Sequence, residues 1–116
     1  MSEFVEVSQI NELRDGTMKE VLVQGREILL ARVGDKYYAA NNRCPHMGAK
    51  LAQGKLEGTI VTCPKHGSQF ELSDGHVVRW TNWSGLISAI SKVLKSPTAI
   101  TVYNVKAQND KILIEI

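Results

Sequence analysis

Two short stretches in the middle of the chain carry residue types that bind metal ions. The first is Cys44-Pro45-His46-Met47-Gly48, and the second is Cys63-Pro64-Lys65-His66-Gly67. They contain the only two cysteines and two of the three histidines, and sixteen residues separate His46 from Cys63. The prolines stiffen the chain just after each cysteine, and the glycines permit sharp turns. If the fold brings the stretches together, they offer one metal centre two sulfur and two nitrogen ligands.

Three interpretations of this pattern compete. A tetrahedral zinc site can use two cysteines and two histidines, but zinc sites usually group cysteine with cysteine and histidine with histidine. Here each stretch carries one of each, which suits a binuclear iron centre in which cysteines hold one iron and histidines hold the other. The third interpretation has no metal: a buried pair of thiols or a disulfide, with two surface histidines.

The spacing C-x-H, then sixteen residues, then C-x-x-H, with a glycine after or near each histidine, resembles the Rieske ferredoxins. These are small electron carriers of ring-hydroxylating oxygenase systems. The resemblance is tight over the middle third of the chain. It implies one [2Fe-2S] cluster per chain, with Cys44 and Cys63 on the first iron and His46 and His66 on the second. It also implies that Ser68 donates a hydrogen bond to a cluster sulfur.

The chain differs from the respiratory Rieske proteins at three positions. Those proteins have an extra cysteine in each loop, and the two form a disulfide, whereas this chain has Ala49 and Lys65 there. Phe70 stands where they have a tyrosine whose hydroxyl donates to the cluster. Donors to the sulfurs stabilise the reduced form and raise the potential. The absence of this hydroxyl therefore predicts a potential in the lower part of the Rieske range, which spans roughly −150 to +300 mV.

Length and composition favour one small domain. The chain has 116 residues, enough to bury a core, and a formal charge of only +2. The weak charge indicates no nucleic acid partner. With both cysteines assigned to the cluster none remains for a disulfide, which fits a reducing compartment. The sequence shows no signal peptide and no apolar run long enough to span a membrane. We expect a single cytoplasmic Rieske domain over 1–116, with no membrane partner.

Alternating apolar residues predict an all-β protein of nine or ten strands. The expected strands cover 4–7, 19–23, 27–33, 36–40, 59–62, 70–72, 76–80, 100–105 and 111–116. By resemblance, they build a Rieske-like antiparallel β-sandwich or barrel with a small cluster-binding subdomain at one end. Cluster-binding loops are expected at 43–50 and 63–70, each following a strand. Apolar residues at helical spacing predict one short inserted helix near 84–95, which either packs on the core or docks a partner.

The resemblance implies one-electron transfer from a flavin reductase to a terminal oxygenase. The chain has no small-molecule substrate of its own, because the mononuclear iron site of an oxygenase needs two histidines and a carboxylate. After the cluster is assigned only His76 remains, and it is expected to be a plain surface residue. The alternative function is an accessory or regulatory subunit of a larger reductase complex, to which the predicted helix gives weight.

Basic residues outnumber acidic ones near the two loops. Between Arg32 and His66 there are six basic side chains and only two acidic ones, Asp35 and Glu57. A positive rim around an electron-exchange site would steer an acidic partner toward it. The basic residues are Arg32, Lys36, Arg43, Lys50, Lys55 and Lys65.

Overall fold

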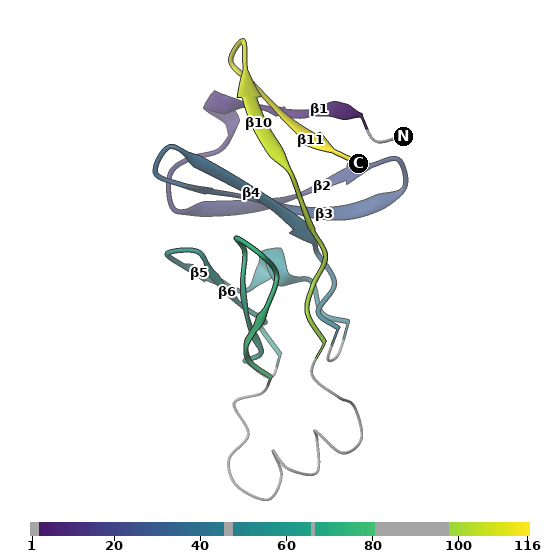
Figure 1. Ribbon diagram of the computed structural model, residues 1–116. Helices are drawn as coiled ribbons and strands as arrows, with labels where there is room; N and C mark the ends of the chain where they lie inside the picture. Colours follow the sequence, from purple (N-terminus) through teal and green to yellow (C-terminus); the bar gives the residue numbers. More distant parts are fainter. Residues whose placement is uncertain (1–2, 46–47, 66, 81–97) are drawn as a thin grey trace, which may run out of the picture.

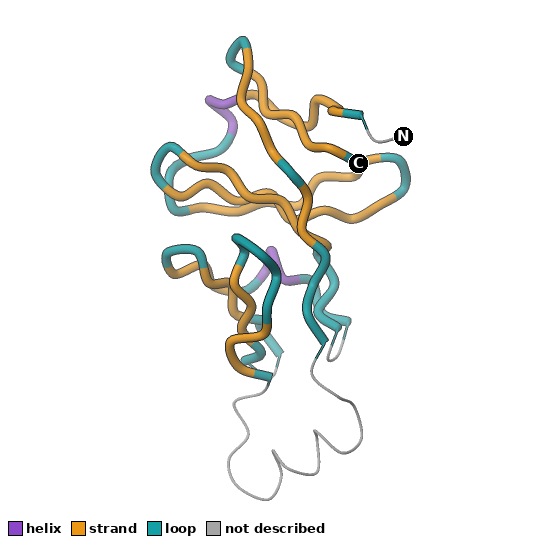
Figure 2. The backbone as a smooth tube through the Cα atoms, viewed as in Figure 1, coloured by secondary structure: helices purple, strands orange, loops and turns teal. Residues whose placement is uncertain are grey.

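The structure is a computed structural model, and it describes residues 3–45, 48–65, 67–80 and 98–116. Within these ranges the regular structure is mostly β, which confirms the predicted class. Its strands form three antiparallel sheets, accompanied by two short 3-10 helices, η1 (Ile10–Glu12) and η2 (Leu51–Gln53). Figure 2 shows the strands stacked in levels, with irregular loops gathered at the lower end of the described chain.

The three sheets follow one another from top to bottom in Figure 1. The upper sheet has the order β1-β11-β10, the middle sheet β2-β3-β4-β9, and the lower sheet β5-β6-β7-β8. The upper strands are β1 (Phe4–Gln9), β10 (Val105–Gln108) and β11 (Lys111–Glu115). The middle strands are β2 (Thr17–Val23), β3 (Arg26–Val33), β4 (Lys36–Asn41) and β9 (Val102–Tyr103). The lower strands are β5 (Lys55–Glu57), β6 (Ile60–Thr62), β7 (Gln69–Glu71) and β8 (Val77–Arg79).

The middle sheet is buried on both faces. Ile28 and Leu30 of β3 lie in a core shared with β11 of the upper sheet, which we call the upper core. Leu29 and Ala31 belong instead to a lower core, shared with the lower sheet and the cysteine-bearing loops. Successive side chains of a strand point to opposite faces, so this uninterrupted apolar run supplies both cores at once. The middle sheet therefore connects the base of the molecule to its loop-bearing end.

Two tight turns set the register of hairpins in the base. Gln24 and Gly25 join β2 to β3 with φ values of 51° and 79°, and Asn109 and Asp110 join β10 to β11 with 54° and 64°. A two-residue turn that is left-handed at both positions matches the twist of the strands it connects. The second turn aligns β11 so that Ile112 and its neighbour two places on enter the upper core.

The structure departs from the sequence-based expectation in two stretches of the chain. The single strand predicted over 100–105 is wrong, because the chain there leaves the middle sheet after β9 and joins the upper sheet as β10. Asn104 stands between the two, and its backbone and side chain both hydrogen-bond Glu115. The stretch 51–56, expected as a plain connection, contains η2 and the start of β5. The helix predicted near 84–95 lies outside the described residues.

The two ends of the described chain lie together. Glu3 and Ile116 exchange two backbone hydrogen bonds, of 3.3 and 3.0 Å. In Figure 1 both ends lie at the upper sheet, at the opposite end from the loops that follow β4 and β6. No helix in the part of the chain that the structure describes is long and apolar enough to cross a membrane.

Candidate metal centre

The two cysteine-bearing loops have the same backbone plan. The first is closed by a bridge between Arg43 and Lys50, and the second by the pairing of Thr62 with Gln69. In each loop the cysteine directly follows the first of the two paired residues. Its N–H donates to the carbonyl five residues on, over 2.8 Å in the first loop and 2.7 Å in the second. The described ends of the two loops are therefore closed in the same way.

Both loops turn at a glycine four residues after the cysteine. Gly48 and Gly67 each have a φ of 73°, a conformation that residues with a side chain rarely adopt. The carbonyl of each glycine accepts a hydrogen bond from an arginine. Arg43 Nη1 donates to Gly48 over 3.0 Å, and Arg79 Nε donates to Gly67 over 3.0 Å. One cation thus braces each loop from outside.

The two sulfur side chains are buried in one core. Cys44 and Cys63 are 2% and 3% exposed, belong to the same lower core, and are thiols rather than halves of a disulfide. Paired loops that each offer a buried thiol fit a cluster that needs two cysteine ligands on one iron. His46 and His66, two and three places beyond the cysteines, lie outside the described residues.

A network of polar side chains fixes the first loop to the middle sheet. Asn42, fully buried, donates to Glu20 over 2.6 Å, and its side-chain oxygen accepts the N–H of Ala52 over 2.8 Å. Lys50 lies 3.2 Å from Glu20 and 3.7 Å from Glu27. The hydrogen bond from Asn42, followed by that from Lys50, holds the pKa of Glu20 below its ordinary value. This carboxylate is therefore charged at neutral pH and anchors both loop residues.

Arg43 joins the same network. Its Nη2 lies 3.1 Å from Glu27 of β3, while its Nη1 holds Gly48 as described. The side chains are half-exposed, so the ion pairs contribute little to stability by themselves. Their main effect is geometric, because they tie the two sides of the first loop to adjacent strands of the rigid sheet.

The second loop is held by close approach of the backbone. Gly54, just before β5, packs against the end of β6, where a Cβ at position 54 would lie 1.8 Å from the Thr62 carbonyl oxygen and 3.2 Å from Pro64 Cδ. A real Cβ essentially never comes this near. The chain segments that lead into β5 and out of β6 are therefore in direct contact immediately before Cys63.

Comparisons with known proteins agree with this geometry. The family model of the Rieske [2Fe-2S] domain matches residues 3–98. The chain belongs to the Rieske family. This Rieske chain is 26% identical to the ferredoxin component of a naphthalene 1,2-dioxygenase system from Pseudomonas putida, covering 97% of this chain and 95% of that relative. The Rieske resemblance noted from the sequence is thereby confirmed, and so is a [2Fe-2S] cluster as the cofactor.

Solved structures show the same fold in two settings. The ferredoxin of carbazole 1,9a-dioxygenase from Nocardioides aromaticivorans IC177 superimposes with a TM-score of 0.79 and 25% identity, covering 96% of this chain and 95% of that chain. The terminal oxygenase of carbazole 1,9a-dioxygenase from Novosphingobium sp. KA1 also gives 0.79, at 21% identity, but only 29% of that chain is covered. This Rieske chain thus has the size of the ferredoxin, and its fold recurs as one part of the oxygenase.

The structure places Ser68 differently from the role the resemblance implies. Ser68 is fully buried, and its hydroxyl donates to the backbone carbonyl of Trp80, the residue directly after β8. A hydroxyl has one proton to donate, so it reaches a cluster sulfur only by turning away from that carbonyl. Donation to a sulfur stays a prediction. Trp80 itself is 3% exposed and packs in the lower core, in agreement with a packing role.

Substituting Ser68 with alanine separates the two roles of this hydroxyl. We expect the free energy of unfolding to fall by about 1 kcal/mol, because the buried Trp80 carbonyl loses its donor. The sequence-based prediction adds a lower reduction potential at unchanged iron content. Thermal unfolding and voltammetry on the same samples measure both. Ser73→Ala, on the exposed turn before β8, is the matched control: it removes only a hydrogen bond to Glu71 and should leave the potential unchanged. If the potential of Ser68→Ala is unchanged, the Ser68 hydroxyl donates to the Trp80 carbonyl, and not to a cluster sulfur, in the cluster-loaded protein.

Several residues that shape the site were not expected from the sequence. Arg79 lies sixteen residues after Cys63, and only the register of β7 with β8 brings it to Gly67. Glu20 and Asn42 meet because β2, β3 and the first loop are adjacent. Asn42, two residues before Cys44, was the one local signal, since a polar residue at the end of an apolar strand needs a buried partner. His76 is exposed and lies 2.6 Å from Asp74, which confirms the expected surface position.

Proposed function

We propose that Cys44 and Cys63 bind one iron of a single [2Fe-2S] cluster, and that His46 and His66 bind the other. The two loops of matching backbone geometry, each starting with a buried thiol, support the cysteine assignment. For the histidines the support is the sequence spacing alone, because they lie outside the described residues. When bound, the cluster supplies a site for one electron, and the chain supplies the two braced loops that keep the sulfur ligands away from water.

The function that follows is one-electron transfer to an oxygenase. The observation that carries it is the near full-length likeness to a ferredoxin component of a dioxygenase system. We infer that the electrons come from a flavin reductase and go to a terminal oxygenase. We further propose that the chain is one cytoplasmic domain with no reaction of its own. In support, both cysteines are thiols, and His76, the third histidine, lies 2.6 Å from Asp74 on the exposed turn before β8.

Metal analysis of the purified protein tests the cluster. We expect about two irons and two acid-labile sulfides per chain, as a [2Fe-2S] centre requires. On reduction the protein should show an EPR signal with a low average g value, because histidine ligation makes the two irons unlike. One zinc per chain without labile sulfide would contradict the assignment.

Reduction and reoxidation of the same protein test the transfer. A flavin reductase should reduce it, and an oxygenase component should reoxidise it in single-electron steps. Stable co-purification with a large reductase, with no exchange of electrons in the free state, would favour the accessory-subunit alternative.

A further inference from the structure

A groove with a volume of about 560 Å³ runs along the outside of the second loop. Three cations line it, each from a different element: Lys55 of β5, Lys65 of the loop and Arg79 of β8. Between them lie uncharged residues of the close approach described above, including Gly54 and Thr62. Cys63 and Pro64 form part of the wall, so whatever occupies the groove contacts the loop that carries a proposed iron ligand.

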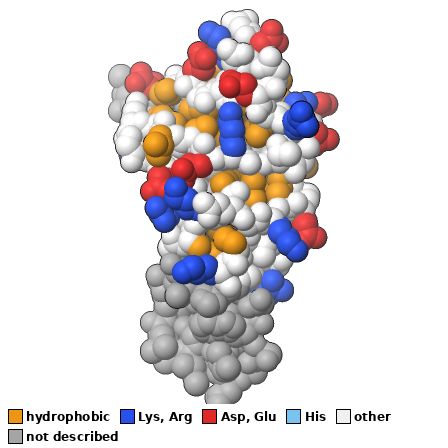
Figure 3. Space-filling model, turned by 180° about the vertical axis from the view of Figure 1, so that it is seen from behind, with side chains coloured by type: hydrophobic (Ala, Val, Ile, Leu, Met, Phe, Trp, Pro, Cys, Tyr) orange, Lys and Arg blue, Asp and Glu red, His pale blue; other side chains and the backbone are white. Residues whose placement is uncertain are grey.

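These three cations have no internal counter-charge. Every aspartate and glutamate of the chain is among the described residues, and none lies within ion-pair distance of Lys55, Lys65 or Arg79. All three side chains are exposed. Figure 3 agrees, because the lowest coloured charges on the described surface are blue and the red ones lie higher.

The neighbouring surface carries cations that are already paired with acidic side chains. A second groove, of about 520 Å³, lies on the other side of Pro64 and Lys65 and contains Arg43 and Lys50. Both of these cations already pair with Glu20 or Glu27. The positive rim predicted from the sequence is therefore wrong in part. Arg32 lies in the base, where its guanidinium is 5.6 Å from the centre of the Tyr37 ring. Of the six predicted residues, only Lys55 and Lys65 carry unpaired charge in the first groove.

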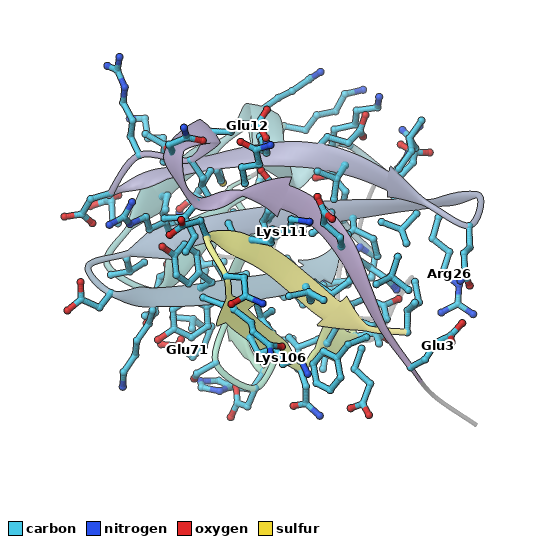
Figure 4. All side chains as sticks on the ribbon, turned by 90° about the horizontal axis from the view of Figure 1, so that it is seen from above. Glu3, Glu12, Arg26, Glu71, Lys106 and Lys111 are labelled. Carbon is cyan, nitrogen blue, oxygen red and sulfur yellow. The ribbon has the colours of Figure 1, made fainter. Side chains whose placement is uncertain are left out.

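The opposite end of the molecule mixes both signs of charge. Figure 4 looks down on that end, where the labelled Glu3, Glu12 and Lys111 lie on or next to the upper strands, and Arg26 lies at the start of β3 in the sheet below. There Lys111 lies 3.4 Å from Glu6 of β1. Three cations without an ion pair thus line one groove beside the second loop, whereas both signs of charge lie together at the opposite end.

We propose that this groove is the docking site for an acidic segment of the redox partner, with the partner's carboxylates bound between Lys55, Lys65 and Arg79. The proposal rests on the proposed electron-transfer function and adds the chemistry of the contact. Three cations without internal acids attract a surface of opposite charge and orient it before contact. Because the groove shares Cys63 with the loop, the docked segment lies against the cluster-binding end, which gives the electron a short path.

Two other occupants fit the groove less well. A small anion such as phosphate is usually held by several backbone N–H groups converging on one point, whereas here three long side chains surround an open groove of peptide size. A nucleic acid needs basic charge extended along its backbone, and the formal charge of +2 with acids on the opposite end offers none. A protein segment carrying two or three carboxylates matches both the size and the number of charges.

The test measures binding of a fluorescent hexaglutamate peptide to the cluster-loaded protein at an ionic strength of about 0.15 M, where the Debye length is about 8 Å. Lys55→Glu should weaken binding about tenfold, because it removes one attraction and adds one repulsion in the groove. Lys36→Glu is the matched control: Lys36 is an exposed lysine at the start of β4, and the substitution changes the net charge equally. It should weaken binding less than about twofold, because a charge beyond the Debye length is largely screened.

The outcomes separate the proposal from its competitors. Equal weakening by both substitutions would mean that only the net charge of the protein affects binding, and would overturn the proposed docking site. Displacement of the peptide by sub-millimolar inorganic phosphate would assign the groove to a small anion. Tighter binding of a short oligothymidylate than of hexaglutamate would assign it to nucleic acid. The visible spectrum of each sample reports the cluster separately, so loss of docking with an intact cluster leaves the electron-transfer function standing.

Discussion

Gly54→Ala is expected to abolish cluster assembly, although position 54 is no ligand. The new Cβ would stand 1.8 Å from the Thr62 carbonyl oxygen and 3.0 Å from its carbon. Both atoms are backbone, so no side chain can rotate aside, and the end of β6 must move. Overpacking of this kind costs roughly 3 kcal/mol or more. The displaced segment leads directly into Cys63, so iron content per chain and the unfolding midpoint should fall together.

Gly58→Ala provides the control on the same hairpin. Gly58, in the turn between β5 and β6, has a φ of 58° and nothing within 4 Å of its added Cβ. The substitution therefore strains only the local backbone, by roughly 1 kcal/mol, and should leave iron and sulfide content unchanged. If Gly54→Ala assembled its cluster as well as Gly58→Ala, the close approach would not position the second loop.

His66→Cys is expected to lower the reduction potential by roughly 100 mV or more, provided that the cluster forms. Two ferric ions, two sulfides, two thiolates and two neutral imidazoles sum to no formal charge. Each thiolate that replaces an imidazole adds one negative charge. This charge disfavours uptake of an additional electron and so lowers the reduction potential. The four-cysteine plant-type centres, near −400 mV, show the size of the effect for two such exchanges. Voltammetry combined with EPR measures it.

His76→Cys is the matched control for this exchange. His76 is exposed on the turn before β8 and lies against Asp74, so the new thiol adds no ligand and the potential should stay the same. His46→Cys gives a second trial if the first variant fails to load iron. A potential that is unchanged in a loaded variant at either position would exclude that histidine as a ligand.

The cofactor of the site was predictable because its signal is local in sequence. Cysteine, proline, histidine and glycine within five residues restrict both the ligands and the turn, and the repeat at positions 63–67 specifies a second copy. The strands leading into these loops were predictable for a similar reason, since alternation within five or six residues marks a strand. β4 and β6 accordingly end at Asn41 and Thr62, within three residues of the cysteines.

What could not be predicted depends on contacts between distant segments. Arg79 braces Gly67 only because β8 pairs with β7 through an irregular register. The division of 100–105 between two sheets depends on Asn104 meeting Glu115, which no local pattern indicates. Likewise, a run such as Ile28 to Ala31 predicts burial on both faces, but not which sheet covers each face.

The adjacent chain ends have a consequence for how this fold is used. Because Glu3 and Ile116 pair at the upper sheet, a second domain joined to either end would emerge on the side facing away from the loops. Neighbouring ends of this kind are what make insertion of a domain into another chain geometrically possible. An electrode surface that captures the protein through a terminal tag would likewise hold it with the loops pointing outward. The pairing of Glu3 with Ile116 thus allows the domain to be tethered at its ends while the loop-bearing end stays uncovered.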